Sequence, residues 1–170
     1  GVPLPDILDD LADFDPTDIS NWIAVGEKIW TIIQANKPVV DVATHKLSIL
    51  PAAQPLWTEM ENWQKPVVRA YRLEAKNLYG MSVISYTYRV AFNYGGSWQG
   101  KGAYIANLTI IPENVAVAWG FKLNSSVEAD EIINTGTKAN PVPGVNMSIK
   151  WRMESIFRTI QGTDSFFARG

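Results

Sequence analysis

The chain has 170 residues, of which 46% are hydrophobic and 19% are charged, and it contains no cysteine. This length suits one domain that buries about 70% of the unfolded chain's surface without help from disulfides. The formal net charge of −2 and the absence of any run of Lys or Arg argue against nucleic acid as a partner. Thiolate metal sites and cysteine nucleophiles are excluded.

The N-terminal part of the chain carries the pattern of a helix. We expect an arm over residues 1–14 and a helix over 15–36, with Asp15 as N-cap and Pro16 at the first helical position. Large apolar residues then follow at helical spacing: Ile19, Trp22, Ile23, Ile29, Trp30 and Ile33. One face of this helix should therefore be buried.

Residues 39–76 give mixed signals, and we interpret them as an irregular connection with edge strands. Short strands are possible within 39–50, whereas prolines divide 51–66 into short pieces. Residues 67–76 alternate, but their two faces differ little in polarity. This pattern predicts a strand at or near the edge of a sheet.

The strongest pattern is a hairpin between Met81 and Ile111. Apolar and polar residues alternate up to Gly95-Gly96-Ser97, where we place the turn, and the alternation then resumes. The apolar face of the first strand consists of Ile84, Tyr86, Tyr88, Val90, Phe92 and Tyr94. Strands of this length need a bend, which we expect at Gly100 and Gly102.

After the hairpin, a third strand is predicted over 115–123 and a last strand from Val145 to Glu154. Residues 124–144, rich in Asn, Ser, Thr, Gly and Pro, are interpreted as a long loop. Residues 81–157 thus form a four-strand antiparallel core, and 158–170 are expected to be a frayed tail.

These elements predict one domain over residues 1–170, mainly β in an α+β arrangement. Two forms stay open. The N-terminal amphipathic helix covers a long-stranded antiparallel sheet, or extra strands from 39–50 and 67–76 close a β-sandwich with the helix packed on it. The second form is favoured.

No convincing catalytic or metal-binding set is present. His45 is the only histidine, and no nucleophile elbow surrounds a serine. The acidic residues near the N-terminus lack the spacing of a calcium loop. Glu59 and Glu61, or the Glu128 to Glu131 group, could pair carboxylates for glycoside hydrolysis, but nothing beyond their presence favours this role. We predict no enzyme, no cofactor and no metal.

An aromatic group near the hairpin turn is the candidate ligand-binding site. Tyr94, Trp98 and Tyr104 could form a stacking platform for a sugar ring or a hydrophobic partner. Core packing and cross-strand pairing of the same rings are the alternative interpretation.

The sequence therefore predicts a non-enzymatic β-rich module for recognition or assembly. Its seven Trp and six Tyr in alternating strands suggest an exported bacterial protein, secreted or periplasmic. The partner would be a protein, a glycan or an apolar small molecule. An alternative is a carrier that holds a lipid-like ligand between the sheet and the helix.

Membrane insertion is not expected. No window approaches the roughly 20 apolar residues of a spanning helix, and four strands are too few to cross a bilayer within one chain. A membrane-active oligomer that pools hairpins is the more distant alternative.

Overall fold

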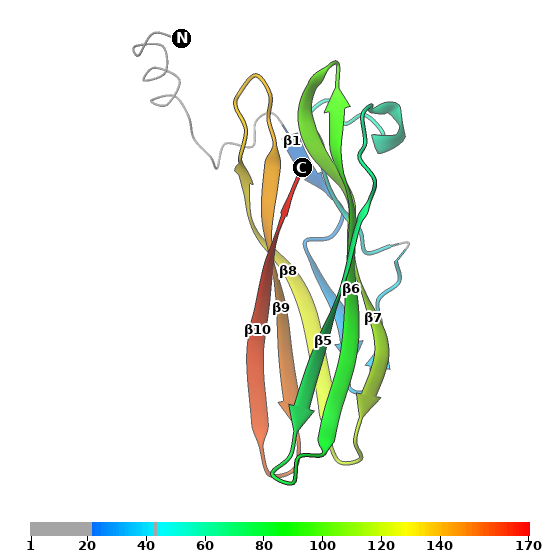
Figure 1. Cartoon of the computed structure of the whole chain (residues 1–170), viewed down its shortest axis with the longest axis vertical. Coiled ribbons are helices and arrows are strands. Elements are labelled where there is room, and N and C mark those ends of the chain that lie inside the picture. The colour runs from blue at the N-terminus through cyan, green and yellow to red at the C-terminus, as the bar shows by residue number, and fades with distance from the viewer. Residues whose placement is uncertain (1–21, 43) are drawn as a thin grey trace, which may run out of the picture.

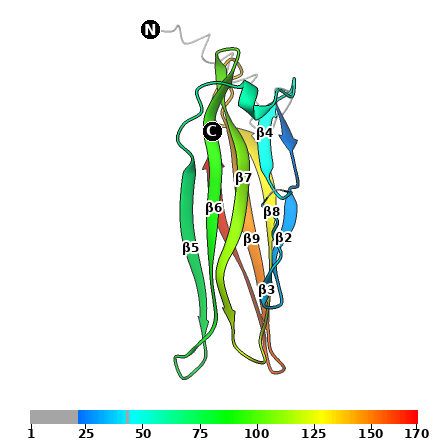
Figure 2. The ribbon, with the colours of Figure 1, turned by 90° about the vertical axis from the view of Figure 1, so that its right-hand side faces the viewer.

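The computed structural model describes residues 22–42 and 44–170 and shows two packed antiparallel sheets of five strands each (Figures 1 and 2). Sheet A has the order β1 (Trp22–Val25), β4 (Leu47–Pro51), β7 (Lys101–Val117), β6 (Ser82–Trp98) and β5 (Val67–Lys76). Sheet B has the order β10 (Thr159–Arg169), β9 (Pro143–Glu154), β8 (Lys122–Asn134), β2 (Ile29–Gln34) and β3 (Lys37–Pro38). A short 3₁₀ turn, η1 (Trp57–Glu59), precedes β5.

The core lies between the sheets because each long strand turns alternate residues inward. Tyr86 and Leu108 of sheet A are buried, as are Val127 and Ile149 of sheet B. The Tyr86 hydroxyl lies 3.3 Å from the Ser125 hydroxyl of the facing sheet. This contact gives two buried polar groups a partner across the interface.

The predicted hairpin is confirmed, but its strands are longer and its turn lies later than expected. β6 and β7 pair from Ile84 with Val117 up to Trp98 with Lys101, so Gln99 and Gly100 form the turn. Gly102, one of the expected bend positions, has a φ of 77° within β7. The edge strand expected over 67–76 is also confirmed as β5.

The helix expected over 15–36 is wrong for its described part, and residues 15–21 and the arm 1–14 lie outside the described residues. Residues 22–34 instead form β1 and β2, separated at Gly26. Gly26 has a φ of 109°, and a Cβ there would lie 1.9 Å from the Lys46 carbonyl oxygen. The apolar spacing read as helical also fits two short strands, since its Ile and Trp residues favour a pleated surface.

The boundaries predicted after residue 111 are wrong in three places. The strand expected over 115–123 spans the end of β7, a turn at 118–121 and the start of β8. The loop expected over 124–144 is mostly β8, and the tail expected over 158–170 is mostly β10. Alternation continues through the turn, while small and polar residues at inward positions, such as Ser125 and Asp164, weaken the pattern in β8 and β10.

Three buried tyrosines make the fold sensitive to alkali. Burial raises the pKa of Tyr86, Tyr88 and Tyr104, and the charge of Asp164 adds to the effect on Tyr88. The unfolded chain therefore loses these protons first, and the free energy of unfolding should fall as the pH rises above about 10. Urea denaturation at increasing pH measures this fall, which Tyr88→Phe should make shallower. An equal pH dependence in the variant would contradict the assignment.

Candidate functional site

The aromatic residues predicted as a ligand platform lie at the end of the sandwich that holds the β6–β7 turn. Tyr104 is only 5% exposed and belongs to the core, whereas Tyr94 and Trp98 are half-buried. The Trp63 ring lies over the backbone of Gly96, and its Nε1 donates to the Trp57 carbonyl at 2.8 Å. The burial of Tyr104 fits the packing interpretation for this residue. Ligand binding by Tyr94, Trp98 and Tyr104 stays a prediction.

Four of the residues considered for catalysis, His45, Glu59, Glu128 and Asp130, have local partners. His45 Nδ1 lies 2.7 Å from Glu27 Oε2. Glu59 accepts a hydrogen bond from the Leu56 amide, and Asp130 accepts one from the Ser148 hydroxyl. Within 22–42 and 44–170, no group of three or more His, Asp or Glu side chains could hold a metal ion.

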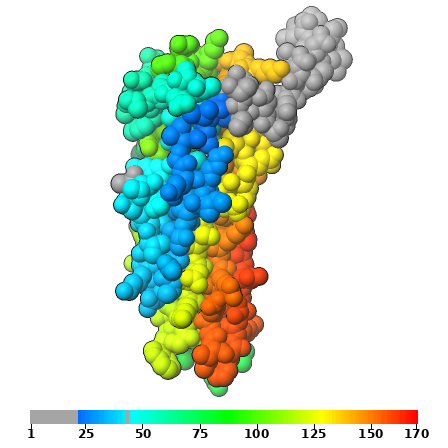
Figure 3. Space-filling model, turned by 180° about the vertical axis from the view of Figure 1, so that it is seen from behind, coloured from blue at the N-terminus to red at the C-terminus, as the bar shows by residue number. Residues whose placement is uncertain are grey.

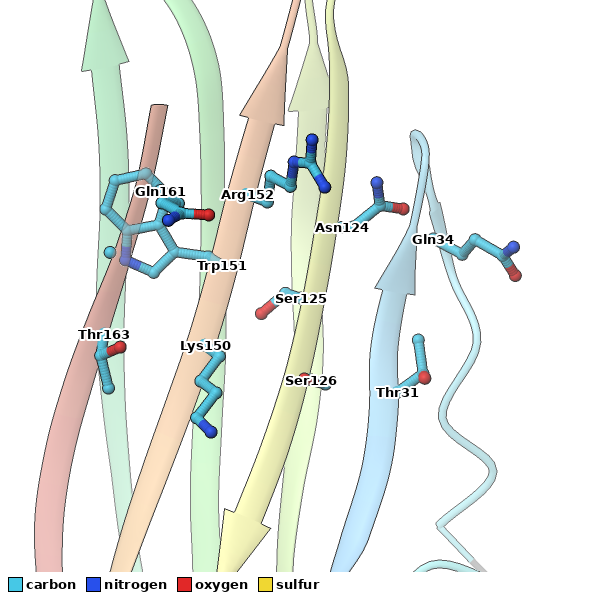
Figure 4. Close-up of a pocket in the computed structure, with 11 residues that line it drawn as sticks. Thr31, Gln34, Asn124, Ser125, Ser126, Lys150, Trp151, Arg152, Gln161 and Thr163 are labelled. Atoms are coloured by element: carbon cyan, nitrogen blue, oxygen red, sulfur yellow. The ribbon is translucent and has the colours of Figure 1, made fainter. Parts of the chain in front are cut away.

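A hollow of about 760 Å³ lies on the outer face of sheet B, across β2, β8, β9 and β10 (Figure 4). Its walls are mostly hydroxyl and amide side chains, with Lys150 and Arg152 as the two cations. Lys150 pairs with Glu128 at 2.5 Å, and Arg152 pairs with Glu154 at 2.7 Å. Because both cations are neutralised within the sheet, this hollow has the character of an ordinary solvated sheet face.

The opposite end from the β6–β7 turn has a different surface, which we call the turn pole. It consists of three hairpin turns that lie together at the lower end of Figures 1 and 2: 77–81, 118–121 and 155–158. Their large apolar side chains are between 62% and 99% exposed: Leu78, Tyr79, Met81, Trp119, Ile156 and Phe157. Turn tips ordinarily carry Gly, Asn, Asp, Ser or Pro, so this composition needs an explanation.

The β5–β6 turn is organised by one side chain. Asn77 Oδ1 accepts hydrogen bonds from the amides of Tyr79 and Met81, both at 3.0 Å. The Gly80 amide donates to the Asn77 carbonyl at 3.1 Å, and Gly80 takes a φ of 78°. The amides of Tyr79, Gly80 and Met81 are thus hydrogen-bonded within the turn, and none of these bonds involves an apolar side chain.

The other two turns are also held by hydrogen bonds within the turn. The Phe121 amide donates to the Ala118 carbonyl at 3.1 Å, with Gly120 at a φ of 85° behind the exposed Trp119. This is the position where a type II turn requires glycine. In the β9–β10 turn, the Ser155 hydroxyl accepts the amide of Arg158 at 3.1 Å, and Ile156 and Phe157 occupy the tip.

The turn pole also differs in charge from the whole chain. The three turns contain no Asp or Glu, and Arg158 is their one charged residue. The adjoining strand ends add Lys76 and Lys122, both exposed, whereas the Glu154 carboxylate is paired with Arg152. The tip of a chain with a net charge of −2 is therefore apolar with a basic rim.

Comparison with protein-family models, with curated protein sequences and with solved structures returns no match. The function is therefore argued from the geometry of this chain alone. In the part of the chain that the structure describes, no helix is long and apolar enough to cross a membrane.

Sequence reasoning missed the turn pole because it depends on correct strand ends. Trp119 was assigned to the apolar face of a predicted strand over 115–123. Ile156 and Phe157 fell at the end of the predicted core over 81–157, after its last strand and just before the predicted tail. A usable signal was present in the sequence. Leu78 and Tyr79 are the two residues before Gly80, and Trp119 comes directly before Gly120. Large apolar residues beside a turn glycine indicate a tip that is exposed for a reason.

The Asn77 side chain is predicted to fix the β5–β6 tip. Asn77→Ala removes both hydrogen bonds to the turn amides and should destabilise the turn by about 1 kcal/mol. Amide hydrogen exchange measured by NMR should become faster at Tyr79 and Met81. Ser155→Ala is the matched control, since it should speed exchange at Arg158 and leave the β5–β6 turn unchanged. Equal exchange at Tyr79 in both variants would refute this role of Asn77.

Proposed function

We propose that this protein is a non-enzymatic module that attaches to the surface of a lipid bilayer through the turn pole. The observation that carries the proposal is the gathering of six large, highly exposed apolar side chains on three adjacent turns. Each such side chain contributes about 1.5–3 kcal/mol when it is removed fully from water. An apolar interface that takes up several of these side chains would therefore stabilise the attached state by several kcal/mol relative to the free protein in water.

The kinds of residue at the turn pole favour a lipid interface over a purely apolar partner. Tyr79 and Trp119 have amphipathic rings of the type enriched at the level of lipid headgroups. Leu78, Ile156 and Phe157 would enter the adjoining acyl region by the depth of a side chain. The amides of Tyr79, Met81 and Arg158 keep their hydrogen bonds within the turns, so entry does not leave these amides unpaired in an apolar medium.

The basic rim favours anionic lipid. Lys76, Lys122 and Arg158 surround the apolar tips, and a cation close to an anionic bilayer surface contributes about 1 kcal/mol. With the turn pole on the bilayer, the long strands stand upright on it and no strand crosses it. This attachment agrees with the expectation of no membrane insertion, and it suits an exported protein, secreted or periplasmic.

The carrier hypothesis has no comparable support. It placed an apolar ligand between the sheet and a helix over 16–35, but residues 22–34 are strands of the two sheets. The core side chains Ile32, Ile105 and Leu108 are fully buried against the facing sheet.

Vesicle flotation tests the proposal. Trp119→Ser combined with Phe157→Ser should weaken binding to phosphatidylcholine vesicles that contain phosphatidylserine by at least about tenfold. The variant loses the burial free energy of two large side chains, and a loss of about 1.4 kcal/mol already lowers the affinity tenfold. Leu56→Ser is the matched control, because Leu56 is 65% exposed beside η1 at the other end of the sandwich.

The rim is tested in the same assay. Binding of the unchanged chain should weaken as salt rises, and more so with phosphatidylserine present than without it. Failure of the unchanged chain to float with either vesicle would reject the proposal. Equal loss in the control and in the turn-pole variant would reject the turn pole as the site.

A further inference from the structure

The two sides of the sandwich are unequal, and one of them is open. On one side the sheets end in the short strands β1 and β3. On the other side they end in β5, with 10 residues, and β10, with 11 residues. Among the described strands, neither β5 nor β10 has a neighbour beyond it. Long unpaired edges of this kind are templates for pairing with another chain.

The two open edges run in opposite directions. Figure 1 looks onto this side, where the arrow of β5 points down to the turn pole and that of β10 points up from it. A two-fold axis along the length of the molecule would bring the open side of one copy against that of another. Rotation about this axis leaves the direction of each strand along the molecule unchanged. Each β5 would therefore meet a β10 of the other copy, and the two strands would be antiparallel.

The heights of the side chains match in this arrangement. Within one copy, Tyr71 of β5 lines a hollow with Asp164 of β10, so the two residues lie at similar heights. A two-fold axis along the molecule preserves height, and both residues turn inward. Pairing Tyr71 with Asp164 then places Val68 opposite Phe167 on the outer face. These two side chains are 54% and 47% exposed, and the pairing would cover both.

The charges select this pairing over pairing of like strands. β5 carries Arg69 on its inward face and Arg72 on its outer face, whereas β10 carries Asp164 on its inward face. Two β10 strands paired at Asp164 would bring two carboxylates together, and a second β5 strand would offer Arg69 no carboxylate on the inward face. Inward-facing charges block like-with-like edge pairing. In the mixed pair, Arg69 stands diagonally next to Asp164 of the second copy.

We propose that the open side is the interface for a second copy of this chain, with β5 of each copy pairing antiparallel with β10 of the other in the register Tyr71 to Asp164. The pair contains two continuous ten-stranded sheets, and both turn poles point the same way. Two turn poles on one bilayer double the apolar and basic contacts, so attachment strengthens through avidity. Only this last consequence rests on the proposed function.

Cysteine cross-linking tests the pairing, because the chain has no cysteine of its own. Ala70 and Ser165 turn outward from opposite sheets of one copy, so they cannot be joined within it. In the proposed pair they lie opposite each other in one continuous sheet, within the roughly 7 Å that a disulfide requires between Cα atoms. Oxidised Ala70→Cys/Ser165→Cys protein should give a covalent dimer on non-reducing gels, either in buffer or on vesicles.

Two controls define the geometry. Ala70→Cys/Asn146→Cys places the second cysteine on the outer face of β9, one strand further away, and should give about tenfold less dimer. Ala70→Cys alone reports pairing of β5 with β5. Dimer from the Ser165 pair above both controls supports the proposal, including when it forms only on vesicles. Dimer no higher than in the controls under both conditions overturns it.

Flotation of the same samples separates the two proposals. Specific dimer without flotation retains the pairing and rejects lipid attachment. Flotation without specific dimer retains lipid attachment and rejects the pairing.

Discussion

Burial of one face of every long strand against the facing sheet is the constraint on which the rest of this structure depends. It requires the chain to alternate inward and outward residues over spans such as Ser82–Trp98 and Lys101–Val117. It also requires each long strand to reverse at the ends of the sandwich. The turns therefore collect at two poles, far from the core, where side chains are free of packing requirements.

The two poles use this freedom in different ways. At the pole with the β6–β7 turn, Trp57 and Trp63 pack edge to face with ring centroids 6.0 Å apart. At the turn pole, Asn77 and Ser155 accept hydrogen bonds from turn amides, and the large apolar side chains are highly exposed. The three turns of this pole lie together at the lower end of Figure 3. The first arrangement packs its rings against each other, with Trp57 still 38% exposed. The second leaves side chains that are 62% to 99% exposed, and this apolar surface is left to be covered by something else. This difference is the physical basis of the proposed attachment.

The extent of correct prediction followed the strength of the alternation. The β6–β7 hairpin and β9 were predicted because large apolar residues occupy their inward positions without interruption. β1 and β2 were mistaken for a helix because four-residue and six-residue strands are too short to distinguish the two periods, and only the backbone at Gly26 separates them. β10 was not predicted as a strand because Gly162 and Asp164 interrupt the row of apolar residues on its inward face.

The candidate site was missed for a related reason. An exposed Trp119 and a buried Tyr104 look alike in sequence, and only the strand ends tell which one lies at a turn. Tyr94, Trp98 and Tyr104 were chosen because they surround a turn that was placed a few residues early. The exposure of Trp119 and the position of the β6–β7 turn both depend on how the strands pair. A local sequence pattern does not contain that information.

The most direct test of the account is the depth of each pole at a bilayer surface. Thr159→Cys places a unique spin label beside the turn pole, and Lys138→Cys places one in the β8–β9 turn at the other end. On vesicles that contain phosphatidylserine, the label at residue 159 should gain accessibility to oxygen and lose accessibility to a water-soluble nickel chelate. The label at residue 138 should keep the values that it has in buffer. Unchanged values at residue 159, or equal changes at both positions, would contradict attachment through the turn pole.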